Sequence, residues 1–118
     1  FLTLKADLNP TPCHVQGADQ FAKMKRGVYG VDNARADLID QKARLAALAD
    51  GTVAGLAIDV MHDEPPAPDD PYFNQSKVLV TTHISAYTEE CLHDMGEKCV
   101  GDVERFVAAK APVHVIET

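Results

Sequence analysis

The chain has 118 residues, of which 46% are hydrophobic and 25% charged, which is ordinary for one small globular domain. Its formal net charge of -7 argues against a nucleic-acid-binding protein, because binding to a phosphate backbone needs clustered Lys and Arg. No apolar run approaches the roughly 20 residues that span a bilayer. Lys5 and Asp7 interrupt the apolar stretch at the beginning, so we expect no signal peptide there.

The cysteines are Cys13, Cys91 and Cys99, an odd number without a Cys-x-x-Cys pair. This pattern indicates neither a disulfide framework nor a zinc knuckle. Cys91 and Cys99 fall on one predicted helix, about 12 Å apart along its axis, which is too far for a disulfide. We therefore expect reduced thiols in a cytoplasmic protein.

The first fifty residues alternate strand and helix patterns. Strands are predicted over residues 1–5 and 28–31, with a short helix over 19–25 between them. A second helix is predicted to begin after Asp40, whose side chain suits an N-cap. Gly51 suits the end of this helix, because glycine adopts the left-handed backbone found there.

Two more strands are predicted, over residues 55–60 and 77–80. The loop over 61–76 is rich in proline and is predicted to hold neither a helix nor a central strand. Strands that alternate with helices indicate right-handed crossovers and a parallel sheet. Because the strands are apolar throughout, we expect helices on both faces of this sheet. The predicted fold class is α/β.

A long helix is predicted over about 88–109, with Glu89 and Glu90 in its first turn, where the helix dipole favours negative charge. Glycines inside this helix lower its stability and suggest close packing against a neighbour. A last strand is predicted over 113–116. The apolar residues that recur at helical spacing are expected to form a buried face: Leu92, Met95, Cys99, Val103, Phe106 and Val107.

Polar residues follow three successive strands and include Arg35, Asp59, Glu64 and His83. Ligands of open parallel sheets bind beyond the carboxyl ends of the strands, so we expect these side chains to converge at one edge. An arginine binds a carboxylate through two parallel hydrogen bonds. A histidine exchanges a proton, and a glutamate beside it orients the ring and stabilises the imidazolium. The set suits reduction of a 2-keto acid.

Each of these residues also has a structural alternative. Arg35 suits a surface ion pair, Glu64 a solvated loop, and a lone His83 after a strand a structural role. Glu90 and His93 have the spacing of metal ligands on a helix, but a solvated helix face explains one such pair better, and no metal is expected. The order of the three loops after strand ends favours a shared catalytic site.

The segments around these residues resemble the D-isomer-specific 2-hydroxyacid dehydrogenases. The similarity covers nearly the whole chain in order. Residues 24–36 are similar to the family's M-K-x-G-A-x-x-I-N-T-A-R-G, residues 51–60 to G-x-I-A-G-A-A-L-D-V, residues 61–66 to F-x-x-E-P-P, and residues 78–84 to V-I-L-T-P-H-I.

The resemblance implies that residues 1–118 are the second half of a Rossmann NAD(P)-binding domain, followed by the long helix that returns to the substrate domain. The implied reaction is hydride transfer between NAD or NADP and a 2-hydroxy or 2-keto acid, in a homodimer. Arg35 would bind the substrate carboxylate, His83 would exchange the proton, and Glu64 would support His83. Asp59 would orient the nicotinamide. The implied cofactor contacts are Leu8, Asn9, Ala34, Arg35, Asp59, His83, Ser85 and Ala86.

The sequence also departs from the family pattern. None of its glycines forms the Gly-x-Gly-x-x-Gly loop that holds a pyrophosphate. We expect this loop, and the residue that separates NAD from NADP, to lie upstream of Phe1 in a longer protein. Ala36 and Ala86 replace glycines near the cofactor, and Arg44 stands where leucine is usual.

Two other functions stay open. One is a non-catalytic, nucleotide-sensing or protein-binding module built on a degenerate dehydrogenase fold, as in the C-terminal binding corepressors. The other is a formate dehydrogenase, because that branch shares the Lys-Arg-Gly-x-Tyr and His-Ile-Ser segments. Formate dehydrogenases pair the histidine with glutamine, however, and Glu64 argues against that branch.

Overall fold

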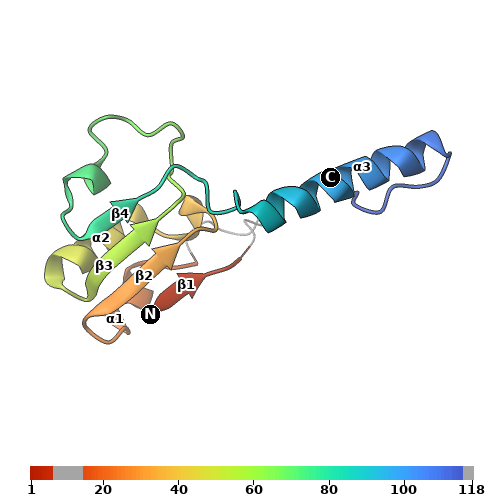
Figure 1. Cartoon of the computed structure of the whole chain (residues 1–118). Helices are drawn as coiled ribbons and strands as arrows, with labels where there is room; N and C mark the ends of the chain where they lie inside the picture. The colour runs from red at the N-terminus through yellow and green to blue at the C-terminus, as the bar shows by residue number, and fades with distance from the viewer. Residues whose placement is uncertain (7–14, 116–118) are drawn as a thin grey trace. The chain divides into compact units, whose positions relative to one another are not determined.

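The computed structural model describes residues 1–6 and 15–115, which divide into two units, Phe1–Ile84 and Ser85–Thr118. The first unit contains a parallel four-stranded sheet with the order β1-β2-β3-β4 (Figure 1). Strands adjacent in the sequence are adjacent in the sheet, and the predicted α/β class is confirmed. The strands are β1 (Leu2–Leu4), β2 (Val28–Asp32), β3 (Val53–Ile58) and β4 (Val78–Val80).

The caps of the main helix of this unit, α2 (Gln41–Asp50), confirm the sequence prediction. The side chain of Asp40 accepts a hydrogen bond from the N–H of Ala43 at 3.0 Å, which satisfies one of the unpaired donors of the first turn. Gly51 ends the helix with a φ of 80°, a left-handed conformation that costs glycine little.

Three shorter helices complete the first unit: α1 (Ala18–Ala22), η1 (Ala36–Leu38) and η2 (Pro71–Asn74). The last of these is a 3-10 turn inside the proline-rich loop, where no helix was predicted. Proline is compatible with this position, because the first residues of a helix need no N–H partner. The Asp70 side chain caps the turn by accepting a hydrogen bond from the N–H of Tyr72 at 2.9 Å.

The core lies between the sheet and its helices. Helix α2 contacts both β3 and α1, and the two helices lie on the same face of the sheet (Figure 1). The buried apolar cluster comprises Phe21, Leu38, Ile39, Ala47, Leu48, Val53, Leu56, Ile58, Met61 and Tyr72.

The opposite face of the sheet is uncovered in the first unit. Tyr29, Val31 and Leu79 expose 53%, 42% and 64% of their surface, and Phe1 is fully exposed. Burial alternates along β1, β2 and β4, as in a sheet covered on one face only. Within the first unit the prediction of two covered faces is therefore wrong. The apolar runs made these strands suitable for a doubly covered sheet but did not identify the covering element.

The second unit is built around helix α3 (Glu89–Val107). Its start agrees with the prediction, because the Thr88 hydroxyl accepts a hydrogen bond from the N–H of Cys91 at 3.1 Å. None of its described side chains is buried, so the predicted buried face is not covered within the second unit. Close packing at Gly96 and Gly101 is also not found, since no described atom lies within 4 Å of a Cβ added at either. Helical periodicity identified the apolar stripe but not a partner for it.

After α3 the described chain forms no strand, and the prediction of one over 113–116 is wrong for residues 113–115. The Asp102 carboxylate accepts hydrogen bonds from the N–H groups of Val113 and His114, at 2.7 and 3.0 Å. These bonds satisfy backbone donors that a sheet would otherwise satisfy. Among the described residues, no helix is both long and apolar enough to cross a membrane.

Candidate active site

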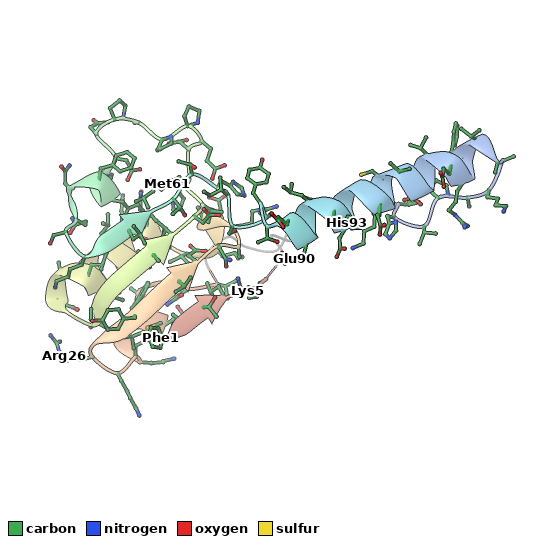
Figure 2. The ribbon with its side chains drawn as sticks, in the orientation of Figure 1. Phe1, Lys5, Arg26, Met61, Glu90 and His93 are labelled. Atoms are coloured by element: carbon green, nitrogen blue, oxygen red, sulfur yellow. The ribbon has the colours of Figure 1, made fainter. Side chains whose placement is uncertain are left out.

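The loops after the strands meet at the carboxyl edge of the sheet, as expected for parallel strands. Figure 2 shows Lys5 and Met61 at this edge, after β1 and β3, and Phe1 and Arg26 at the opposite edge. Backbone hydrogen bonds hold the edge together: the N–H of Asp59 donates to the carbonyl of Asp32, across from β3 to β2, at 2.9 Å.

Glu64 and His83 form the central contact of the site. The Oε2 atom of Glu64 lies 2.7 Å from Nδ1 of His83, although the two residues are 19 positions apart in the sequence. An ionised carboxylate can only accept, so Nδ1 donates and carries a proton. The other ring nitrogen, Nε2, is then the atom that can exchange a proton with a ligand. The expected hydrogen bond between these residues is present.

The Glu64 carboxylate is held in its ionised form. The hydrogen bond with His83 is the largest cause that lowers the pKa of Glu64, and a 3.0 Å hydrogen bond from the N–H of Met61 to Oε1 is the second. Desolvation opposes the shift, and the charges of His83 and Arg35 add to it. The anion next to His83 stabilises the imidazolium.

Asp59 anchors the turn that carries His83. Its Oδ1 atom accepts a hydrogen bond from the Thr81 hydroxyl at 2.5 Å and another from the N–H of Ile84 at 3.0 Å. These donors lie on either side of His83, whose φ of 57° places it in the left-handed region. A non-glycine residue in that region needs support from its surroundings. Asp59 is only 6% exposed and provides this support.

Arg35 lies in the loop after β2 and is exposed. Its backbone is extended and precedes η1, and its Nη1 atom donates to the carbonyl of Ala34 at 2.8 Å. The guanidinium is close enough to lower the pKa of Glu64 through its charge. Lys5, Ala6, Asn33, Ala34 and Arg35 line a hollow at this edge. Two cationic side chains there favour an anionic ligand.

The remaining predicted site residues are not brought into this group. Leu8 and Asn9 lie outside the described residues. Ser85 and Ala86 belong to the second unit. Ala36, which replaces a glycine of the family pattern, is buried, with 5% of its surface exposed.

Sequence reasoning missed three contributors to the site: Thr81, the N–H of Met61, and Lys5, whose ammonium group donates to the Asn33 side chain. A backbone N–H carries no sequence signal. Thr81 and Lys5 did carry a signal, because each follows a strand end at the same edge as the predicted residues.

Comparison with known proteins gives one family. The model described as "D-isomer specific 2-hydroxyacid dehydrogenase, NAD binding domain" matches residues 1–85. The chain is 36% identical to glycerate dehydrogenase of Methylorubrum extorquens over 118 residues, covering 98% of the chain and 37% of that protein. It is 34% identical to D-3-phosphoglycerate dehydrogenase of Methanocaldococcus jannaschii over 116 residues, covering 98% of the chain and 22% of that protein.

Solved structures with a similar fold include members of the same family. An NAD-complexed D-isomer-specific 2-hydroxyacid dehydrogenase from Lactobacillus delbrueckii ssp. bulgaricus matches with a TM-score of 0.84 at 25% identity. That match covers 97% of this chain and 39% of the other. The chain therefore spans between 22% and 39% of the length of these relatives.

Proposed function

The chain belongs to the D-isomer-specific 2-hydroxyacid dehydrogenase family, and we propose that it supplies the proton-exchanging and carboxylate-binding groups of such an enzyme. The proposed reaction is reversible hydride transfer between a nicotinamide dinucleotide and a 2-hydroxy or 2-keto acid. The observation that carries the proposal is the 2.7 Å hydrogen bond between Glu64 and His83, with the cationic Arg35 nearby.

In the direction of reduction, the guanidinium of Arg35 would hold the carboxylate of a 2-keto acid through two hydrogen bonds. As C2 receives the hydride, the electron pair of the carbonyl bond moves to its oxygen. Nε2 of His83 would donate its proton to this oxygen, giving the 2-hydroxy acid and a neutral imidazole. Glu64 would hold Nδ1 and stabilise the protonated ring beforehand. Oxidation reverses each transfer.

A reduced nicotinamide, when bound, would supply the hydride. The residues at the carboxyl edge suit an anionic part of the dinucleotide, because the cationic side chains of Lys5 and Arg35 border a hollow there. Asp59 would lie beside the nicotinamide while its Oδ1 atom holds the His83 turn. Ala34, Ser85 and Ala86 remain proposed contacts from the resemblance.

The partner of His83 supports the hydroxyacid branch over formate dehydrogenase. Here the ring is held by a carboxylate, whereas formate dehydrogenases use the uncharged amide of glutamine. A carboxylate favours the protonated imidazole, which reduction of a keto acid needs. Release of carbon dioxide from formate needs no such proton donor.

The test is oxidation of NADH and NADPH by the full-length protein with a panel of 2-keto acids. His83→Asn removes the proton donor and should lower kcat by roughly 100-fold to 10,000-fold. The control is His93→Asn, because His93 is an exposed histidine of α3 outside the proposed site. Full turnover in the His83 variant would contradict the assignment. No turnover in the wild type would favour a nucleotide-sensing role.

A further inference from the structure

A buried ion pair lies beneath the candidate site. Nη1 of Arg44, on α2, lies 2.7 Å from Oδ2 of Asp32, the last residue of β2. Their side chains are 1% and 2% exposed. Removal of two charges from water is costly, and such a pair is tolerated only when its geometry and hydrogen bonds are good. Removal of one partner leaves an uncompensated charge.

Tyr72 completes the network. Nε of Arg44 donates to the Tyr72 hydroxyl at 2.6 Å, and the guanidinium carbon lies 4.9 Å from the centre of the ring. Burial is the largest cause that raises the pKa of Tyr72, so this residue keeps its proton and brings no charge. The only charges in the contact are therefore those of Asp32 and Arg44.

Asp32 also reaches the loop that carries Arg35. Its Oδ1 atom lies 3.4 Å from the N–H of Ala34, the residue that directly precedes Arg35. A negative charge at this position would repel an anion bound by Arg35, and the buried surroundings would screen it weakly. The direct contact with Arg44 cancels that charge.

We propose that Arg44 controls the affinity of the site for anionic substrates by neutralising Asp32. Arg44 is a positioning residue in this scheme, because it acts on Arg35 through Asp32 and touches no substrate. The inference rests on the proposed function, in which Arg35 binds the carboxylate of the substrate.

The test uses charge variants of the full-length protein. Arg44→Met leaves the carboxylate of Asp32 uncompensated, and KM for the 2-keto acid should rise about tenfold. Asp32→Asn leaves the positive charge instead, and KM should fall about threefold. The double variant, Asp32→Asn with Arg44→Met, carries neither charge and should have a KM close to that of the wild type.

A purely structural role for the pair predicts a different pattern. Both single variants would then disturb the loop in the same way, and KM would rise in both or in neither. That result would overturn the proposal. Tyr72→Phe is the uncharged control, since it removes the hydrogen bond to Arg44 without changing any charge, and its KM should stay within twofold of the wild type.

Two further experiments cover the cases in which a variant does not fold or the full-length protein reduces no 2-keto acid. If Arg44→Met does not fold, Arg44→Lys keeps the charge and should keep the wild-type KM, whereas a tenfold rise would count against the neutralisation argument. Calorimetric titration with oxamate, a carboxylate that needs no turnover, repeats the comparison. Suppose that no 2-keto acid is reduced, but Arg44→Met binds oxamate more weakly and Asp32→Asn binds it more tightly than the wild type. The proposed function then fails and this inference stands. If wild-type protein does not bind oxamate, or its affinity ignores the charges, the inference is wrong.

Discussion

Asp59 accepts a hydrogen bond from the N–H of Ile84 at 3.0 Å, between the loops that follow β3 and β4, and so fixes the residue directly after His83. Asp59→Ala removes this acceptor and should cost about 1–3 kcal/mol of stability, because two donors lose their partner. Asp59→Asn keeps one oxygen and should cost less. Thermal unfolding measures which of the two variants is less stable. Because His83 loses its position, kcat should fall in Asp59→Ala even at temperatures where the variant remains folded. Asp63→Asn, in the exposed part of the same loop, is the matched control.

Glu64→Gln should slow the reduction of a 2-keto acid. The ionised carboxylate accepts a hydrogen bond from Nδ1 of His83 at 2.7 Å, whereas the amide of glutamine carries no charge. Loss of this charge-assisted hydrogen bond should lower kcat roughly tenfold to 100-fold. Steady-state kinetics with the full-length enzyme measures the change, and an unchanged kcat would show that the charge of Glu64 is not needed.

The same residue predicts an effect of acid on stability. The pKa of Glu64 in the folded protein lies below its ordinary value of 4.5. Its contribution to stability is therefore present above pH 4.5 and is lost as the pH falls through the lowered value. Unfolding curves at a series of pH values should show a smaller acid dependence for Glu64→Gln than for the wild type. Equal slopes would mean that the solvated pair contributes nothing measurable.

Arg35→Lys tests the mode of carboxylate binding. Lysine keeps the positive charge but cannot present two parallel donors. Loss of one charge-assisted hydrogen bond should raise KM for the 2-keto acid roughly tenfold to 100-fold. Steady-state kinetics with the full-length enzyme checks this. An unchanged KM would show that Arg35 contributes charge alone.

Two glycines give a paired test of the helices. Gly51 has a φ of 80°, so Gly51→Ala should destabilise the first unit by about 1 kcal/mol. Gly96 lies inside α3 with no described atom within 4 Å of an added Cβ, so Gly96→Ala should stabilise that helix by up to about 1 kcal/mol. Calorimetry on the full-length protein decides between these signs. Destabilisation by Gly96→Ala would reveal a neighbour packed against that glycine.

The uncovered sheet face predicts the behaviour of these 118 residues when expressed alone. Tyr29 and Leu79 are exposed on that face, and β1 and β4 are edge strands. Exposed edges and apolar faces pair with other chains. The isolated chain should self-associate in sedimentation velocity experiments, and Tyr29→Lys with Leu79→Lys should reduce the association. A wild-type monomer over the whole concentration range would exclude this behaviour.

Much of the first unit could be predicted because local chemistry decided it. Asp40 begins α2 through its side-chain cap and Gly51 ends it through its left-handed backbone, as predicted, and the apolar runs gave all of the described strands. The Glu64–His83 contact followed from parallel topology, which brings strand ends together. What failed depended on other parts of the fold. Apolar residues of α3 were assigned to a core that the second unit does not form around them.

Arg44 is an informative exception beneath the candidate site. It lies at helical spacing from Ala47 and Leu48, on the buried stripe of α2. A charged residue on such a stripe signals a buried partner. The identity of that partner depends on the way α2 packs on the sheet, which the sequence pattern does not contain.

The Glu64–His83 pair is accessible to water, because 40% of the Glu64 side chain and 46% of the His83 side chain are exposed. Attraction between opposite charges rises about fourfold between bulk water and a typical protein surface, and dissolved salt screens it while water has access. Hydration, rather than distance, therefore sets the strength of this pair. A substrate that displaces the water raises the attraction between the two groups. Proton exchange at His83 thus becomes coupled to the presence of substrate, and high ionic strength should weaken the pair most when no substrate is bound.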